Sequence, residues 1–227
     1  MADLRAIIFD LDETLADRTR TRDRFLELWI QHYWNDREHD PDQLHAVFCS
    51  LDNNGYRAKD ELYHMLVEEL KWTDPPTEAE HSAFWQEHFP KLSEPMDNLH
   101  NTLDYFHRQG LKIGLITNGR EQVQRAKIDT LAIGRYFHAT YISGAVGVKK
   151  PDGAIFEQCL GALEVRPEEA WYVGDHPVND VRGSAAVGIT PIWLSQDKIW
   201  NEEHEVKPAH TVRSLHELIE LYESLRG

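Results

Sequence analysis

Five short apolar runs, rich in β-branched and aromatic residues, alternate with longer segments in which apolar residues recur at helical spacing. The runs lie at 6–9, 112–116, 140–143, 170–173 and 190–194. They are mostly continuous rather than alternating with polar residues, which is typical of strands buried on both faces of a parallel sheet. Helical periodicity predicts helices at 97–109, 120–131, 152–163, 179–187 and 214–225. This alternation predicts an α/β fold with a Rossmann-like, doubly wound parallel sheet.

The interval from residue 16 to residue 95 breaks this alternation. No strand pattern is visible there, but apolar residues still recur at helical spacing, as at Phe25, Leu28 and Trp29. We therefore expect an all-helical domain at 16–95, inserted into an α/β core formed by 1–15 and 96–227.

Composition limits the possible partners. The chain has 227 residues, of which 41% are hydrophobic, which fits a globular protein of one large domain or of one domain carrying an insertion. It carries 24 Lys and Arg against 39 Asp and Glu, and a formal charge of -15 argues against nucleic acid or an anionic membrane as a partner. A small anionic substrate is still allowed if the site supplies its own cations.

Cysteine content and the lack of targeting signals bear on localisation. Cys49 and Cys159 are too few for a disulfide framework and lack the paired spacing of a metal site. The first apolar run is too short for a signal peptide, and no stretch approaches the roughly 20 apolar residues of a membrane span. We expect a cytoplasmic protein.

Polar residues follow four of the predicted strands, where the ligand site of an open parallel sheet lies. They are Asp10 and Asp12 after the first, Thr117, Asn118 and Gly119 after the second, Lys149 and Lys150 after the third, and Asp175 and Asp180 after the fourth. Converging carboxylates favour a hard cation, and Mg²⁺ fits best because it keeps several waters and works with phosphates. A hydroxyl, backbone amides and an ammonium group suit a tetrahedral oxyanion beside it.

Each of these motifs has a simpler interpretation when taken alone. An Asp-x-Asp pair can cap a helix, Asn-Gly is a common turn, and "KKPD" can be a solvated loop. Their occurrence in order, each at the end of a strand, favours a common site.

The four motifs, together with a helical insertion after the first, resemble the haloacid dehalogenase-like (HAD) superfamily, in its phosphatase branch with a helical cap. The resemblance implies that Asp10 is the nucleophile and Asp12 the general acid/base. It implies phosphate binding by Thr117, Asn118, Gly119 and Lys150, and metal binding by Asp10, Asp12 and Asp175, with Asp180 in support. Lys150 is preferred to Lys149 because the lysine of the family usually stands directly before proline, here Pro151.

The implied function is that of a Mg²⁺-dependent phosphomonoester hydrolase acting through an aspartyl-phosphate. Its partner would be a small phosphorylated metabolite, for example a nucleotide, flavin mononucleotide or a sugar phosphate. A phosphomutase would share every core motif and stays an alternative. A hydrolytic dehalogenase needs neither Asp12 nor Asp175, and the intact acid, lysine and hydroxyl set argues against a non-catalytic binding module.

Substrate contacts from the insertion are harder to predict. Arg18 opens a run of arginines at alternate positions to Arg24, which could reach a substrate but is better interpreted as a solvated hinge. Tyr56 and Lys59 could stack on and bind a ring, or could simply pack. His176 follows Asp175 and could touch the site or occupy a loop, and the thirteen histidines show no zinc-type paired spacing.

Overall fold

The computed structural model describes residues 3–35, 39–55 and 57–226, and the chain divides into two compact units. Met1–Asp17 with Glu94–Gly227 form one, named here the core unit, and Arg18–Ser93 form the other, named the helical unit. The division thus falls after residue 17 and before residue 94, whereas the sequence predicted 15 and 96. That the helical unit acts as a cap remains a prediction.

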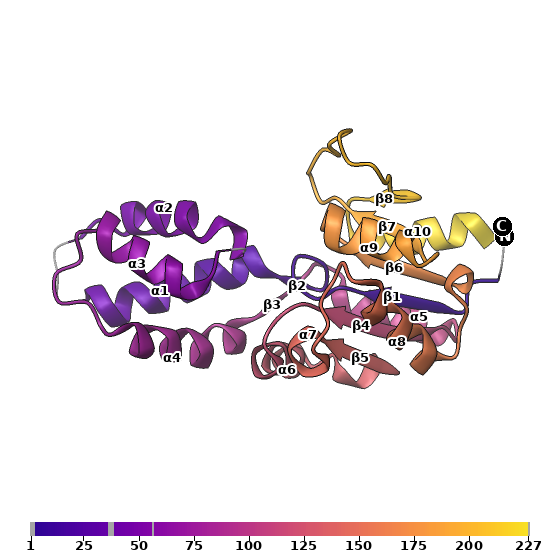
Figure 1. Cartoon of the computed structure of the whole chain (residues 1–227), viewed down its shortest axis with the longest axis horizontal. Helices are drawn as coiled ribbons and strands as arrows, with labels where there is room; N and C mark the ends of the chain where they lie inside the picture. The colour runs from indigo at the N-terminus through magenta and orange to yellow at the C-terminus, as the bar shows by residue number, and fades with distance from the viewer. Residues whose placement is uncertain (1–2, 36–38, 56, 227) are drawn as a thin grey trace. The chain divides into compact units, whose positions relative to one another are not determined.

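A six-stranded parallel sheet forms the centre of the core unit, with strand order β5-β4-β1-β6-β7-β8 (Figure 1). The strands are β1 (Ala6–Phe9), β4 (Lys112–Thr117), β5 (Ala139–Ile142), β6 (Ala170–Gly174), β7 (Thr190–Leu194) and β8 (His210–Val212). Phe9 is in register with Leu115 and Val173, so β1, β4 and β6 end side by side. The predicted α/β fold is confirmed. Sequence analysis missed β8, because three residues at a sheet edge carry no apolar run.

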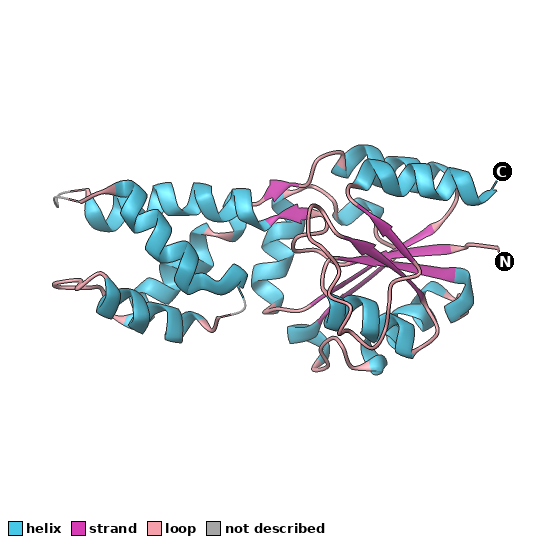
Figure 2. Cartoon of the chain, turned by 90° about the horizontal axis from the view of Figure 1, so that it is seen from above, coloured by secondary structure: helices cyan, strands magenta, loops and turns pink. Residues whose placement is uncertain are grey.

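Helices cover both faces of this sheet (Figure 2). One face packs on α5 (Leu99–Arg108) and α10 (Leu215–Arg226), and the other packs on α8 (Gly153–Leu163). Strand side chains alternate between the faces, so Ile7 enters the first core and Ile8 the second. The other helical segments here are α6 (Glu121–Thr130), η3 (Gly134–Tyr136), α7 (Ser143–Val146), η4 (Pro167–Glu169), the π-helix η5 (Pro177–Arg182) and α9 (Gly183–Ala186). The helix predicted at 179–187 is therefore divided between η5 and α9.

Two short strands lie where the chain leaves and re-enters the core unit. β2 (Ala16–Asp17) and β3 (Glu94–Pro95) pair antiparallel, with Asp17 opposite Glu94. No strand pattern is visible in the sequence at these positions, because two residues are too few to show a periodicity.

The helical unit contains four helices and two 3-10 turns among its described residues. They are α1 (Arg18–Trp34), α2 (Pro41–Asp52), η1 (Asn53–Gly55), α3 (Lys59–Glu69), α4 (Glu78–His88) and η2 (Pro90–Leu92). Its core is rich in aromatic residues: Trp29 lies edge-on to Phe48 and to Trp72, with ring centroids 5.6 and 5.3 Å apart. The arginine run, interpreted from the sequence as a solvated hinge, lies within α1 at the start of the helical unit: Arg24 is exposed, whereas Arg18 is buried.

None of the helices in the described part of the chain is both long and apolar enough to cross a membrane.

Candidate active site

Lys150 lies at the centre of the polar cluster at the strand ends. Its Nζ donates to Asp10 Oδ1 at 2.7 Å, to Asp180 Oδ1 at 2.7 Å and to the Tyr172 hydroxyl at 2.8 Å. Lys150 is buried, whereas Lys149 is exposed. Burial opposes the charge of Lys150, but Asp10 and Asp180 outweigh it and raise the pKa of the lysine. The structure thus brings Lys150, and not Lys149, to the first aspartate.

Three buried carboxylates converge beside this lysine. Asp10, Asp175 and Asp180 each offer an oxygen within 4.8 Å of the others. Burial, together with the neighbouring Asp180 and Asp175, raises the pKa of Asp10, although Lys150 opposes this shift. Burial and Asp180 also raise the pKa of Asp175 to about 7, although Lys198 donates to Asp175 Oδ2 at 2.9 Å.

The donor set of this cluster fits Mg²⁺. All of its ligand atoms are carboxylate oxygens, which hard cations prefer. The three carboxylates share two lysines, Lys150 and Lys198, so a bound cation would relieve the charge repulsion that raises the pKa values of Asp10 and Asp175. Asp10 and Asp175 are the better candidate ligands, because both oxygens of Asp180 already accept hydrogen bonds, from Lys150 and from the backbone N–H of His176.

Local structure explains how Asp180 reaches the cluster. Gly174 ends β6, and a Cβ at this position would lie 2.4 Å from the Asp180 carboxyl group. The glycine before Asp175 therefore makes room for Asp180, rather than for a ligand. His176 has a structural role here: its Nδ1 accepts from the backbone N–H groups of Val178 and Asn179 and caps η5.

Asp12 faces a different set of partners. Lys127 Nζ donates to both of its carboxylate oxygens, at 2.7 and 2.8 Å, and Gln124 Nε2 donates to Oδ2 at 2.9 Å. Both partners are buried and come from α6, one helical turn apart. The Asp12 side chain, expected among the metal ligands, is not in the carboxylate cluster that could hold an ion. Sequence reasoning missed Gln124 and Lys127. The only available signal was that two polar residues on one face of a helix follow "TNG".

The phosphate-binding candidates at the end of β4 are held by hydrogen bonds to neighbouring residues of the core unit. Thr117 is buried, and its hydroxyl accepts from Gln124 Nε2 at 2.6 Å. The Asn118 side chain makes two hydrogen bonds with the backbone of Lys150, at 2.9 and 3.0 Å. Gly119 has φ +151°, and its N–H donates to Ser143 Oγ at 3.0 Å. The Asn118 side chain therefore positions the lysine loop.

The helical unit brings two of its three specificity candidates together. Arg18 and Lys59 donate to the two oxygens of Asp52, at 2.8 and 2.7 Å, and Asp52 is fully buried. Lys59 also lies over the Trp85 ring, 4.4 Å from its centroid. Arg18 and Lys59 thus both bind a buried carboxylate inside the helical unit. The third candidate, Tyr56, lies outside the described residues.

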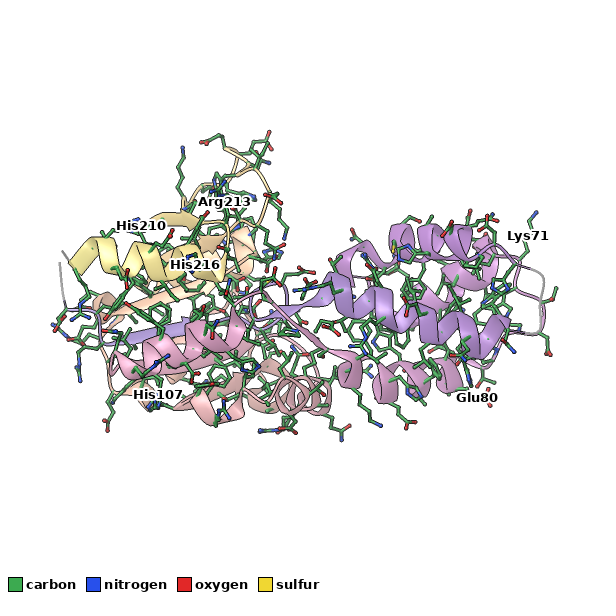
Figure 3. All side chains as sticks on the ribbon, turned by 180° about the vertical axis from the view of Figure 1, so that it is seen from behind. Lys71, Glu80, His107, His210, Arg213 and His216 are labelled. Atoms are coloured by element: carbon green, nitrogen blue, oxygen red, sulfur yellow. The ribbon has the colours of Figure 1, made fainter. Side chains whose placement is uncertain are left out.

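Among the described residues, no histidine belongs to the group of side chains in this cluster that could hold a metal ion. His107, His210 and His216, labelled in Figure 3, come from α5, β8 and α10, and His216 pairs with Glu220 one turn away at 3.5 Å. His81 is buried among the aromatic residues of the helical unit and accepts from Trp29 Nε1 at 3.1 Å.

Comparison with known proteins agrees with this arrangement. A family model described as haloacid dehalogenase-like hydrolase matches residues 7–194. A glyceraldehyde 3-phosphate phosphatase from Pyrococcus furiosus is 30% identical over the whole of this chain and 96% of its own length. A phosphoserine phosphatase from Thermus thermophilus is 39% identical, but the match covers 49% of this chain and 44% of that protein.

A solved structure with the same fold is that of a magnesium-bound HAD-hydrolase, YfnB from Bacillus subtilis. It has a TM-score of 0.79 at 19% sequence identity, and the match covers 96% of this chain and 98% of that one. The family match spans most of the chain and includes all four motifs at the strand ends. The chain therefore belongs to the haloacid dehalogenase-like hydrolase family.

Proposed function

We propose that this hydrolase is a Mg²⁺-dependent phosphatase that cleaves phosphomonoesters of small metabolites through an aspartyl-phosphate on Asp10. One observation is the main support for the proposal: the two aspartates of the first motif, Asp10 and Asp12, contact different residues. Asp10 pairs with Lys150 in a carboxylate cluster suited to a cation, and Asp12 is held outside it by Gln124 and Lys127. A nucleophile and a separate proton carrier need such a division.

The residues of the chain suggest the following sequence of events. Asp10 attacks phosphorus and forms the acyl phosphate, and Asp12 gives a proton to the departing alkoxide. Asp12 then takes a proton from the water that cleaves the acyl phosphate. Lys150, with the hydroxyl of Thr117, offsets the negative charge of the phosphoryl oxygens.

A metal ion would be held by Asp10 and Asp175, with Asp180 in support. When bound, Mg²⁺ would neutralise charge on the phosphoryl group and on the carboxylates. We expect that Ca²⁺ substitutes badly, because it takes more ligands at longer distances and could occupy both oxygens of Asp10.

The substrate class is drawn from the relatives. The substrates named for the two phosphatases above, phosphoserine and glyceraldehyde 3-phosphate, are small phosphorylated three-carbon metabolites. The formal charge of -15 supports a small substrate rather than nucleic acid. Both cysteines are free thiols, which supports a reducing compartment and hence the cytoplasm.

A phosphatase screen tests the proposal. Metal-free protein would be assayed on a panel of three-carbon, sugar and nucleoside monophosphates, with Mg²⁺ or Ca²⁺ and with no bisphosphate activator. Free phosphate should appear with Mg²⁺ only, and Asp10→Asn should abolish it for every substrate. Isomerised sugar phosphate that forms only after a bisphosphate activator is added, without phosphate release, would show a phosphomutase instead. Full activity of Asp10→Asn would exclude the assigned nucleophile.

A further inference from the structure

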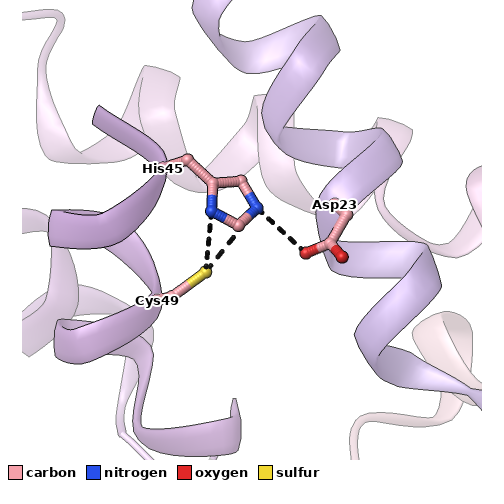
Figure 4. Close-up of side chains that lie close together, drawn as sticks. All are labelled: Asp23, His45 and Cys49. Carbon is pink, nitrogen blue, oxygen red and sulfur yellow. Dashed lines mark hydrogen bonds and ion pairs between the residues drawn. The ribbon is translucent and has the colours of Figure 1, made fainter. Parts of the chain in front are cut away.

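A nitrogen, a sulfur and an oxygen donor meet in the helical unit, on residues that the proposed reaction does not use (Figure 4). Asp23 comes from α1, and His45 and Cys49 come from α2. His45 Nε2 lies 3.1 Å from Asp23 Oδ1, and Cys49 Sγ lies 3.6 Å from Nδ1 and 3.9 Å from Nε2 of the same ring. One atom from each residue can be chosen so that all three lie within 4.8 Å of one another.

The arrangement is built by helix geometry. His45 and Cys49 are four residues apart and therefore share one face of α2, which packs against α1. Two N–H groups of Arg22 donate hydrogen bonds to the same oxygen of Asp23, Oδ1, at 3.0 and 3.1 Å. Within the described residues, Asp23 Oδ2 is therefore still available for a cation. The His45 and Asp23 side chains are 42% and 44% exposed, so an ion can enter from solvent.

We propose that Asp23, His45 and Cys49 bind one divalent ion of the Zn²⁺ class, with the fourth position left to water. Thiolate and imidazole are ligands that Zn²⁺ prefers, whereas Mg²⁺ and Ca²⁺ prefer oxygen. With metal–ligand distances of about 2.0–2.3 Å, a tetrahedral ion places its donors roughly 3.3–3.8 Å apart. The separations of His45 Nε2 from Asp23 Oδ1, the oxygen that Arg22 also contacts, and from Cys49 Sγ are 3.1 and 3.9 Å and lie on either side of that range.

Charge and proton balance are consistent with this site. Burial raises the pKa of the Cys49 thiol, so the thiol is protonated before the ion arrives. On binding, the thiol proton leaves to solvent, and the imidazole binds the ion through Nε2 with a proton on Nδ1. The thiolate and the Asp23 carboxylate then balance the two positive charges, and Arg22 keeps its bonds to Asp23.

The simpler alternative is a polar contact between two helices, and the chain contains a matched example of one. His64 Nε2 lies 3.1 Å from Glu78 Oε2, the same separation as in the His45–Asp23 pair. No cysteine belongs to a metal-ligating group with this pair among the described residues. His64→Ala is therefore the control for His45→Ala. The second cysteine, Cys159, is fully buried in the core unit.

Cobalt titration of the full-length, metal-free protein tests the site. Co²⁺ is a spectroscopic substitute for Zn²⁺, and a thiolate-to-cobalt charge-transfer band appears only if sulfur is a ligand. We expect one equivalent of Co²⁺ to give this band and one equivalent of Zn²⁺ to remove it. Cys49→Ser should lose the band, His45→Ala should weaken Co²⁺ binding roughly tenfold or more, and His64→Ala should change nothing. Absence of the band, its survival in Cys49→Ser, or equal losses in both histidine variants would overturn the proposal.

Alkylation of the protein without substitutions gives a second, independent measurement. Cys159 is inaccessible in the folded protein, so slow alkylation followed by mass spectrometry reports on Cys49. One equivalent of Zn²⁺ should slow modification of Cys49 roughly tenfold or more, and excess Mg²⁺ should not. Equal protection by both ions, or protection by neither, would exclude a thiolate-bound metal.

Discussion

At the scale of single residues, the two aspartates of the first motif are distinguished by the lysines that they contact. Lys150 binds Asp10 inside the carboxylate cluster, and Lys127 binds both oxygens of Asp12 from α6. The motif alone predicts two acidic groups with different roles. It does not predict Lys127, because that contact joins residues 115 positions apart and depends on how α6 packs.

Lys127→Met tests whether this contact positions Asp12 for proton transfer. We expect turnover of an alkyl phosphate to fall roughly tenfold or more, because the proton donor loses its orientation. With p-nitrophenyl phosphate, the rate of the first step, phosphoryl transfer to Asp10, should fall less. The reason is that nitrophenolate leaves without a proton. Arg125→Met removes an exposed cation from the same helix and is the control. Equal losses on the two substrates would assign Lys127 a purely structural role.

At the scale of elements, a buried ionic cluster connects α1, α2 and α3 in the helical unit. Asp52 ends α2, and its carboxylate is held by Arg18 at the start of α1 and by Lys59 at the start of α3. Burial alone would raise the pKa of Asp52, but the two cations outweigh it and lower that pKa. Gly55 permits the approach: it has φ +87°, and a Cβ there would lie 2.3 Å from Arg18 Cζ.

Arg18→Met should destabilise the helical unit, since it leaves Asp52 buried with a single cation. We expect the free energy of unfolding to fall by about 3 kcal/mol. Lys91→Met, which removes an exposed lysine of the same unit, should change it by less than about 0.5 kcal/mol. Denaturant unfolding of the full chain measures both. An unchanged stability in Arg18→Met would mean that Lys59 alone satisfies Asp52.

His81 should make the stability of the protein depend on pH. Burial, with a smaller effect from Lys59, lowers the pKa of His81 to about 4, against about 6.5 in the unfolded chain. Between these values the unfolded chain binds the extra proton, so the free energy of unfolding should decrease as pH falls from 6.5 to 4. The total loss would be about 3 kcal/mol.

His81→Gln keeps an acceptor for Trp29 Nε1 but cannot titrate in this range. Its unfolding free energy should therefore fall less with pH than that of the unaltered protein. The measurement is urea unfolding at a series of pH values from 7 to 4.5. If the unfolding free energies of the two proteins fell equally with pH, His81 would not be the source of the pH dependence.

Periodicity predicted the main elements well where a segment is long or buried on both faces. The central strands β1, β4 and β6 are continuous apolar runs, because helices cover both faces of the sheet. Periodicity failed for β2, β3 and β8, which are too short to show a pattern. Contacts within the helical unit were also not predictable, because the pairing of Asp52 with Arg18 is set by the packing of separate helices.

At the scale of the whole molecule, the chain consists of two units that each have their own hydrophobic core. Two apolar clusters lie on either side of the sheet, and a separate aromatic cluster fills the helical unit. Asp17 and Glu94 face each other in the β2–β3 ladder, where the insertion begins and ends. The motif residues all belong to the core unit. We therefore expect the chemistry to reside in the core unit and the selectivity in the helical unit.

Deleting residues 18–93 tests this division. An Asn-Gly turn can join Asp17 to Glu94, because facing residues of an antiparallel pair accept a two-residue loop. We expect the shortened protein to fold and to hydrolyse p-nitrophenyl phosphate with Mg²⁺. It should lose most of its discrimination among metabolite phosphates, measured as the ratio of their kcat/KM values. Retained discrimination would place selectivity in the core unit.

The central claim is that Asp10 carries the phosphoryl group and Asp12 carries the proton. Rapid mixing of Asp12→Ala with p-nitrophenyl phosphate and Mg²⁺, followed by acid quench and peptide mapping, tests both halves together. We predict a burst of nitrophenol of up to one equivalent and then a stall, with phosphate on Asp10, because no base remains to activate water. Absence of a burst, or phosphate on any residue other than Asp10, would contradict the account.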